Sequence, residues 1–120
     1  MTLAAAWIIF ILGLGHMVVG LVMFRAPLMA AVREGLVGKF TMNPERRTAF
    51  WFMIFGPLLI MGGHVAIHAV NVADAELLKI AGFYLFATGI AGTLALPRSP
   101  FVVALLVAPV FIAAGYGWIA

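Results

Sequence analysis

Three histidines are the residues of this 120-residue chain whose type and position could do chemistry. His16 lies near the middle of an apolar run and shares a helical face with Gly13 and Gly20, so we expect its ring to face protein rather than lipid. Such an imidazole either satisfies a polar contact inside the membrane or binds a cofactor. For the polar contact, we expect Thr88, Thr93 or a backbone carbonyl freed by a proline as the partner.

His64 and His68 are four residues apart, which places both rings on one face of a helix. This spacing can chelate one metal ion but cannot supply both axial ligands of one haem. Asp74 and Glu76 follow after a short turn, so His64 and His68 with Glu76 or Asp74 form a candidate metal site. The alternative is ordinary hydrogen bonding and solvation at the membrane interface.

Depth separates His16 from His64. At 1.5 Å per residue the two lie roughly 10 Å apart along the membrane normal, so we do not expect them to share a metal or a haem within one subunit. Two copies of His16 across a symmetry axis would lie at equal depth, which leaves a bis-histidine haem in a homodimer open. Haem or a transition metal is thus the cofactor hypothesis, with none certain. The chain has no cysteine, which excludes thiolate metal sites and disulfides.

The elements that carry these residues are apolar helices. With 66% hydrophobic and 9% charged residues, the chain has too little polar surface for a water-soluble domain. It contains four apolar runs, each near the roughly 20 residues that cross a bilayer as a helix. We predict an all-α integral membrane protein, a single-domain antiparallel four-helix transmembrane bundle over residues 1–120. The predicted spans cover residues 3–24, 48–70, 75–96 and 101–120.

Helix starts are marked by short polar residues. Asn43 followed by Pro44 predicts that the second helix begins before its hydrocarbon segment. Asp74 is the expected N-cap of the third helix, and Ser99-Pro100 repeats the cap-then-proline pattern before the fourth. These signals predict where each helix begins.

The cationic residues predict the topology. Six of the seven fall in the two connections on one side of the membrane: Arg25, Arg33, Lys39, Arg46, Arg47 and Arg98. The positive-inside rule makes these connections cytoplasmic and both termini external, as in a multi-pass protein of the cell inner membrane. The net charge of +3 therefore reflects topology and implies no nucleic-acid partner. The connection over residues 25–48 is long enough for a short interfacial helix, which we expect to end near Gly35.

Glycine recurs at seven-residue spacing in three of the spans. Since burial against protein gains little over lipid, small residues on one face mark where helix backbones approach each other. We therefore expect helix contacts at these six positions: Gly13, Gly20, Gly56, Gly63, Gly82 and Gly89.

Three short motifs carry a resemblance to known sequences. They are Gly15-His16 with Gly20-Leu21, Arg47-Thr48-Ala49-Phe50-Trp51-Phe52 with Gly56, and Pro97-Arg98-Ser99. Over most of its length the chain resembles a family of small uncharacterised four-helix bacterial membrane proteins. The family pattern tends to place glycine where this chain has Pro100, and it does not include His64 or His68. The resemblance implies the membrane fold and marks His16 as a group feature, without implying a reaction.

Three function hypotheses follow. The leading one is a non-enzymatic membrane protein, an accessory or interaction subunit or a self-associating bundle, whose partners are the lipid bilayer and a second copy or larger membrane complex. The second is a haem or metal protein that uses His16 or the His64 and His68 pair on a lipophilic substrate. The third is a small transporter of the size of the small multidrug exporters. The absence of a carboxylate within the first span argues against transport.

Overall fold

The computed structural model describes residues 1–120 and contains helices but no strands. Five α-helices and one short 3-10 helix follow one another along the chain. They are α1 (Thr2–Met23), α2 (Arg25–Arg33), the 3-10 helix η1 (Lys39–Thr41), α3 (Pro44–Asn71), α4 (Ala75–Ala95) and α5 (Phe101–Gly115).

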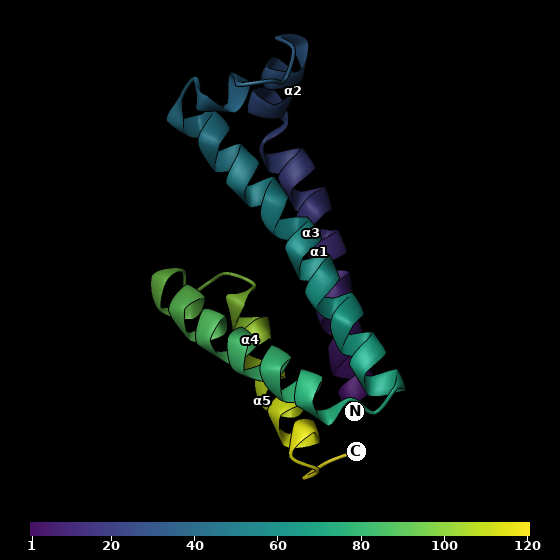
Figure 1. Cartoon of the computed structure of the whole chain (residues 1–120). Helices are drawn as coiled ribbons and strands as arrows, with labels where there is room; N and C mark the ends of the chain where they lie inside the picture. Colours follow the sequence, from purple (N-terminus) through teal and green to yellow (C-terminus); the bar gives the residue numbers. More distant parts are fainter.

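The four long helices pack as two antiparallel pairs, α1 with α3 and α4 with α5. Figure 1 shows that the pairs meet near the end where both termini lie and diverge toward the other end, where α2 and η1 sit beyond the α1–α3 pair. The molecule measures 52 × 29 × 20 Å along its principal axes. The all-helical class is thus confirmed, whereas a single four-helix bundle is not, because the two pairs contact each other over only part of their length.

Buried glycines lie at the contacts within each helix pair. All six glycines at seven-residue spacing are buried, which confirms that they mark helix contacts. A Cβ atom added to Gly63 would overlap the backbone of Phe10, and one added to Gly89 would lie 2.9 Å from the Leu105 nitrogen. Backbone therefore packs against backbone in both pairs, and a side chain at either position would push the helices apart.

The core lies where the two pairs meet. It is a cluster of small and aliphatic side chains with one aromatic ring: Ala5, Ala6, Ile9, Ala66, Ala69, Leu78, Val107 and Phe111. Phe111 and Ile9 are its largest fully buried side chains. Beside this core, the buried Thr2 donates a hydrogen bond through Oγ1 to the carbonyl of Ala120 at 2.7 Å. The two ends of the chain are therefore tied together at the same end of the molecule.

Two of the predicted helix caps are confirmed. The side chain of Asn43 accepts a hydrogen bond from the Arg46 nitrogen at 2.8 Å, and that of Asp74 accepts one from the Leu77 nitrogen at 2.9 Å. Each bond satisfies one of the free N–H groups in the first turn of its helix.

The boundaries of α5 differ from the prediction. Its start lies one residue later than the cap-then-proline pattern implies, because Pro100 occupies the N-cap position and the Ser99 hydroxyl turns back to the Leu96 carbonyl. The predicted span 101–120 is helical only to Gly115. Gly117 has a φ of +76°, and its N–H and that of the next residue close on carbonyls of the last turn, which ends the helix.

Helix length separates α5 from the others. The helices α1, α3 and α4 are long and apolar enough to cross a membrane, whereas α5 has 15 residues. At 1.5 Å per residue, α5 spans about 22 Å against a hydrocarbon core of about 30 Å.

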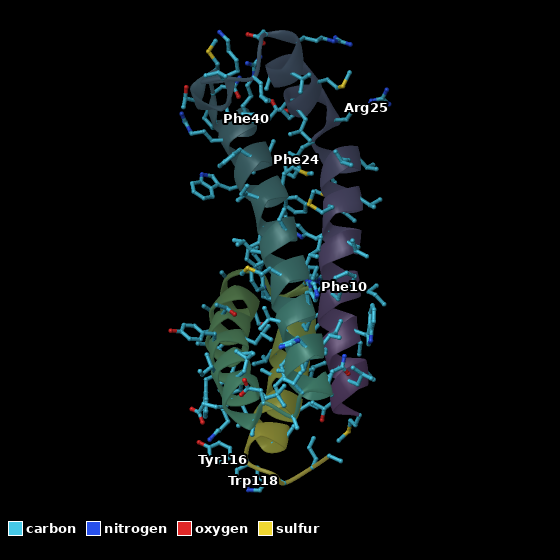
Figure 2. The ribbon with its side chains drawn as sticks, turned by 45° about the vertical axis from the view of Figure 1, so that its right-hand side comes forward. Phe10, Phe24, Arg25, Phe40, Tyr116 and Trp118 are labelled. Atoms are coloured by element: carbon cyan, nitrogen blue, oxygen red, sulfur yellow. The ribbon has the colours of Figure 1, made fainter.

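A short helix, α2, is present where an interfacial helix was predicted, and it begins directly after Phe24. Gly35, with a φ of +99°, follows its end as expected. In Figure 2, Phe24, Arg25 and Phe40 lie at the end of the molecule that carries α2, and Tyr116 and Trp118 lie at the opposite end. The turn between α4 and α5, which carries Arg98, ends part of the way along α3 (Figure 1).

Candidate functional site around His16

His16 lies in the contact between α1 and α3, where its ring is half-buried. Its Nε2–H donates a hydrogen bond of 2.7 Å to the backbone carbonyl of Phe52. A carbonyl can only accept, so Nε2 must carry the proton in this arrangement. In the neutral ring, Nδ1 is then left with a free lone pair.

Aromatic rings of α3 surround the imidazole. The Phe52 ring stacks on it with centroids 3.9 Å apart and an interplanar angle of 15°, and the Phe55 ring meets it edge-on at 5.6 Å. A Cβ atom on Gly56 would lie 3.6 Å from the His16 Cδ2 atom. The imidazole is thus bordered by two phenylalanine rings and a glycine of the facing helix, which restrict its orientation.

The acceptor lies beside a proline bend. Pro57 has no N–H, so the carbonyl that it leaves without a helical donor belongs to Met53, four residues earlier. His16 bonds to the carbonyl one residue before that, at Phe52. The partner of His16 is therefore a backbone carbonyl beside the proline. It is not the carbonyl that the proline directly frees, which was the third of the expected partners.

The two predicted threonine partners are not used. The Thr88 hydroxyl donates to the Tyr84 carbonyl of its own helix at 2.8 Å. The Thr93 hydroxyl is buried and has no hydrogen-bond partner. Both lie on α4, which packs mainly against α5 and not against the segment of α1 that carries His16.

Two methionines pack against the glycines of the same α1–α3 contact, a placement that sequence reasoning missed. The Met17 sulfur lies over Gly56, and the Met53 sulfur lies over Gly20. Figure 2 shows sulfur atoms between the ribbons of α1 and α3. A thioether over a glycine fills the space that the missing side chain leaves. Imidazole and thioether groups are also ligands that soft metal ions such as Cu(I) accept.

The same geometry bears on haem binding. Nε2 is the ring nitrogen farther from the backbone and is therefore the one best placed to reach a bulky macrocycle. Because Nε2 is bonded to the Phe52 carbonyl, a haem ligated through it would require this hydrogen bond to break. Cofactor binding by His16 stays a prediction, and any ligand that leaves the bond intact must use Nδ1.

His64 and His68 lie on exposed parts of α3. The Phe10 ring meets His64 edge-on with centroids 6.4 Å apart. The carboxylate of Glu76 forms an ion pair with the Lys79 ammonium group at 2.9 Å, so it already has a partner. The structure contains no group of three His, Cys, Asp or Glu side chains placed to hold a metal ion. It therefore does not gather His64, His68 and Glu76, and metal binding by them stays a prediction.

A polar cluster at the end of α2 was also missed by sequence reasoning. Arg46 pairs with Glu34 and donates to the Lys39 carbonyl at 3.2 Å, while Arg47 donates to the Thr41 carbonyl at 3.2 Å. The hydrogen bond from Arg46 holds the pKa of the Glu34 carboxyl below its usual range. These contacts join α2 and η1 to the start of α3, so they shape the connection and lie away from His16.

One comparison with known proteins is informative. The model of a family of unknown function, DUF6463, matches residues 2–118. No curated protein and no solved structure matches the chain. The match agrees with the expected uncharacterised family, whose bacterial distribution and sequence motifs stay predictions.

Proposed function

We propose that this chain, which belongs to the DUF6463 family of unknown function, is a multi-pass inner-membrane protein that acts by associating with a second copy of itself. Its activity is otherwise unknown, and the proposal assigns it no reaction. The observation that carries the association is a row of small residues on α4 that no other part of the chain covers.

The position of the termini supports four membrane crossings. Three helices are long and apolar enough to cross, which alone would put the two termini on opposite sides. However, Thr2 and Ala120 are hydrogen-bonded to each other, so an even number of crossings fits better. The shorter α5 would complete the fourth crossing together with the stacked rings of Tyr116 and Trp118, residues that favour the membrane interface. Five of the seven cations lie at the far end, which favours external termini.

The small-residue row faces away from the body of the molecule. Ala87, Ala91 and Ala95 follow one another at four-residue spacing and are exposed. The buried face of α4, with Gly82 and Gly89, lies on the other side of the helix. Within this chain, small residues at regular spacing are the positions where helices touch. The same rule predicts that the exposed row is a contact surface.

A comparison with α1 argues against lipid as the only occupant of this row. The exposed face of α1 carries large aliphatic side chains, such as Val18, Leu21 and Val22. Such side chains suit contact with acyl chains. On α4 the exposed Tyr84 and Leu94 flank the row, and its alanines allow the backbone of another helix to lie close. A two-fold axis along the membrane normal would bring α4 of each copy together at equal depth.

Single cysteines test this proposal without background, because the chain has none of its own. We expect Ala91→Cys to cross-link two copies in native membranes and the matched control Val18→Cys, on the exposed face of α1, to remain monomeric. We further expect Ala91→Phe to abolish the dimer in size-exclusion chromatography with light scattering, while Val18→Phe leaves it intact. Equal cross-linking at both positions, or a monomeric wild-type chain, would refute the association.

The same approach tests the topology. Val72 lies in the turn between α3 and α4 and Val37 in the connection after α2, and both are exposed. We expect an impermeant thiol reagent to label Val72→Cys but not Val37→Cys in intact cells. The reverse pattern would invert the topology, and labelling at both positions would contradict membrane insertion.

A further inference from the structure

We propose that the corner between α1 and α2 binds an anionic phospholipid of the leaflet on that side. A groove of about 530 Å³ runs along this corner. Five of its seven lining residues are hydrophobic, and the other two are Arg25 and Arg33. The proposal rests on the membrane placement argued above but not on association through α4.

The groove lies where hydrocarbon and headgroups would meet. One wall is the last turn of α1, at Val22 and Met23, which are among the exposed apolar residues of that helix. The other wall is α2, whose Pro27 and Ala31 are buried on its opposite side. Figure 2 shows Arg25 at this end of the molecule, projecting outward from the helices. An acyl chain against the apolar wall would therefore place its headgroup near the arginines.

Neither arginine is neutralised within the chain. Arg25 and Arg33 are exposed and form no ion pair or side-chain hydrogen bond. Glu34, the acidic residue nearest to them in the sequence, is already paired with Arg46. Two free guanidinium groups, eight residues apart on one short helix, flank the groove and complement a phosphate group.

The lining favours a lipid over a free anion. Inorganic phosphate would gain the arginine contacts but would meet the apolar surface of Met23 and Met29 without benefit. A phospholipid satisfies both the charged and the apolar part of the groove. The leaflet on the cytoplasmic side, where the positive-inside rule places α2, is also the one that carries anionic lipids.

Lipid binding to the purified full-length chain tests the proposal. We would measure retained lipid by native mass spectrometry, with phosphatidylglycerol and phosphatidylcholine as probes. We expect the wild type to retain one phosphatidylglycerol in preference to phosphatidylcholine. Arg25→Gln and Arg33→Gln should each weaken this binding about five-fold or more, since each removes one charge-assisted contact. Arg98→Gln removes the same charge from a loop outside the groove and should bind as the wild type does.

A second variant addresses the apolar wall. Ala26→Trp fills the groove without changing its charge, so it too should displace the lipid. Helical content by circular dichroism verifies that each variant folds. Unchanged binding in both arginine variants, or an equal loss in Arg98→Gln, would overturn the proposal. Equal binding of the two lipids, or full displacement by glycerol phosphate, would overturn it as well. Ala91→Phe should leave lipid binding unchanged, which separates this proposal from the association through α4.

Discussion

The α1–α3 pair and the α4–α5 pair both pack through buried glycines, yet they handle polar groups differently. In the α1–α3 pair the half-buried His16 donates a hydrogen bond to a carbonyl of the facing helix. In the α4–α5 pair, the buried hydroxyl of Thr93 reaches nothing. The α1–α3 pair also continues into the charged connection with the Glu34 and Arg46 ion pair. The α4–α5 pair is joined by a short turn.

This difference shows that packing by small residues and hydrogen bonding of polar groups are separate requirements when apolar helices pack. Buried glycines at regular spacing allow the backbones of two helices to approach closely. Whether a polar side chain then finds a partner depends on the register of that pair. Variants in each helix pair can separate these two properties.

The largest effect should come from the glycine contacts, and it should be greater in the α1–α3 pair. A Cβ on Gly63 would overlap the Phe10 backbone, which cannot move without moving the helix. A Cβ on Gly89 would approach the Leu105 backbone nitrogen less closely, at 2.9 Å. We expect Gly63→Ala to lower the free energy of unfolding by about 3 kcal/mol and Gly89→Ala by about 1 kcal/mol. Reversible unfolding in mixed detergent micelles measures both.

The adjacent Gly62 supplies the matched control, because a Cβ there meets nothing within 4 Å. Gly62→Ala should leave stability unchanged or raise it by up to about 1 kcal/mol, since alanine is the better helix former. If Gly62→Ala and Gly63→Ala cost the same, close backbone approach would not be what holds α1 to α3.

A smaller effect should separate the polar groups of the two helix pairs. His16→Leu leaves no donor for the Phe52 carbonyl and should cost about 1–2 kcal/mol of unfolding free energy, the scale of one interhelical hydrogen bond. His16→Gln keeps an N–H donor and should preserve much of the stability. Thr93→Val removes a hydroxyl that has no partner, so stability should stay the same or rise.

The same variants test the cofactor hypothesis. If His16 ligates haem or a metal, both Gln and Leu should abolish the visible absorbance or the bound metal, because neither supplies an imidazole nitrogen. A wild-type chain purified without chromophore or stoichiometric metal, after expression with iron and haem precursor, would remove that hypothesis. A fully stable His16→Leu with unchanged metal content would contradict both roles.

The smallest effect concerns the ion pair in the charged connection, where the Glu34 carboxylate is exposed to solvent. The pKa of Glu34 is lowered, so the stabilising contribution of the pair is complete above the ordinary carboxyl pKa and is lost as the pH falls through the lowered one. Carbon-13 NMR of the carboxyl should show Glu34 titrating below its usual range, and Arg46→Gln should return it there. Arg47→Gln should not, because Arg47 bonds to the Thr41 carbonyl. Normal titration of Glu34 in the wild type would contradict the pairing.

Much of the fold could be predicted because its signals are local. Asn43 and Asp74 cap helices since each side chain bonds to a backbone group three residues ahead. Gly35 follows α2 because a residue with positive φ is needed there. The end of α5 was missed although Gly117 offers the same signal, since the apolar residues around it favour a longer span. The end of α3 at Asn71 lies one residue beyond the predicted end of the second span, although the positive φ in the following turn falls on Ala73 and not on a glycine.

From the sequence, His16 lies within a helix apolar enough to cross a membrane, on the same face as two glycines, and was expected to face protein and to need a polar partner. The packing of the helices was needed to identify this partner as the carbonyl of Phe52, 36 residues away, and to show that the α4–α5 pair leans away from α3. The reason is energetic. In a chain this apolar, many helix pairings and registers bury similar surfaces. The glycine spacing predicts which face of a helix packs, but the partner helix and the register depend on contacts between segments far apart in the sequence.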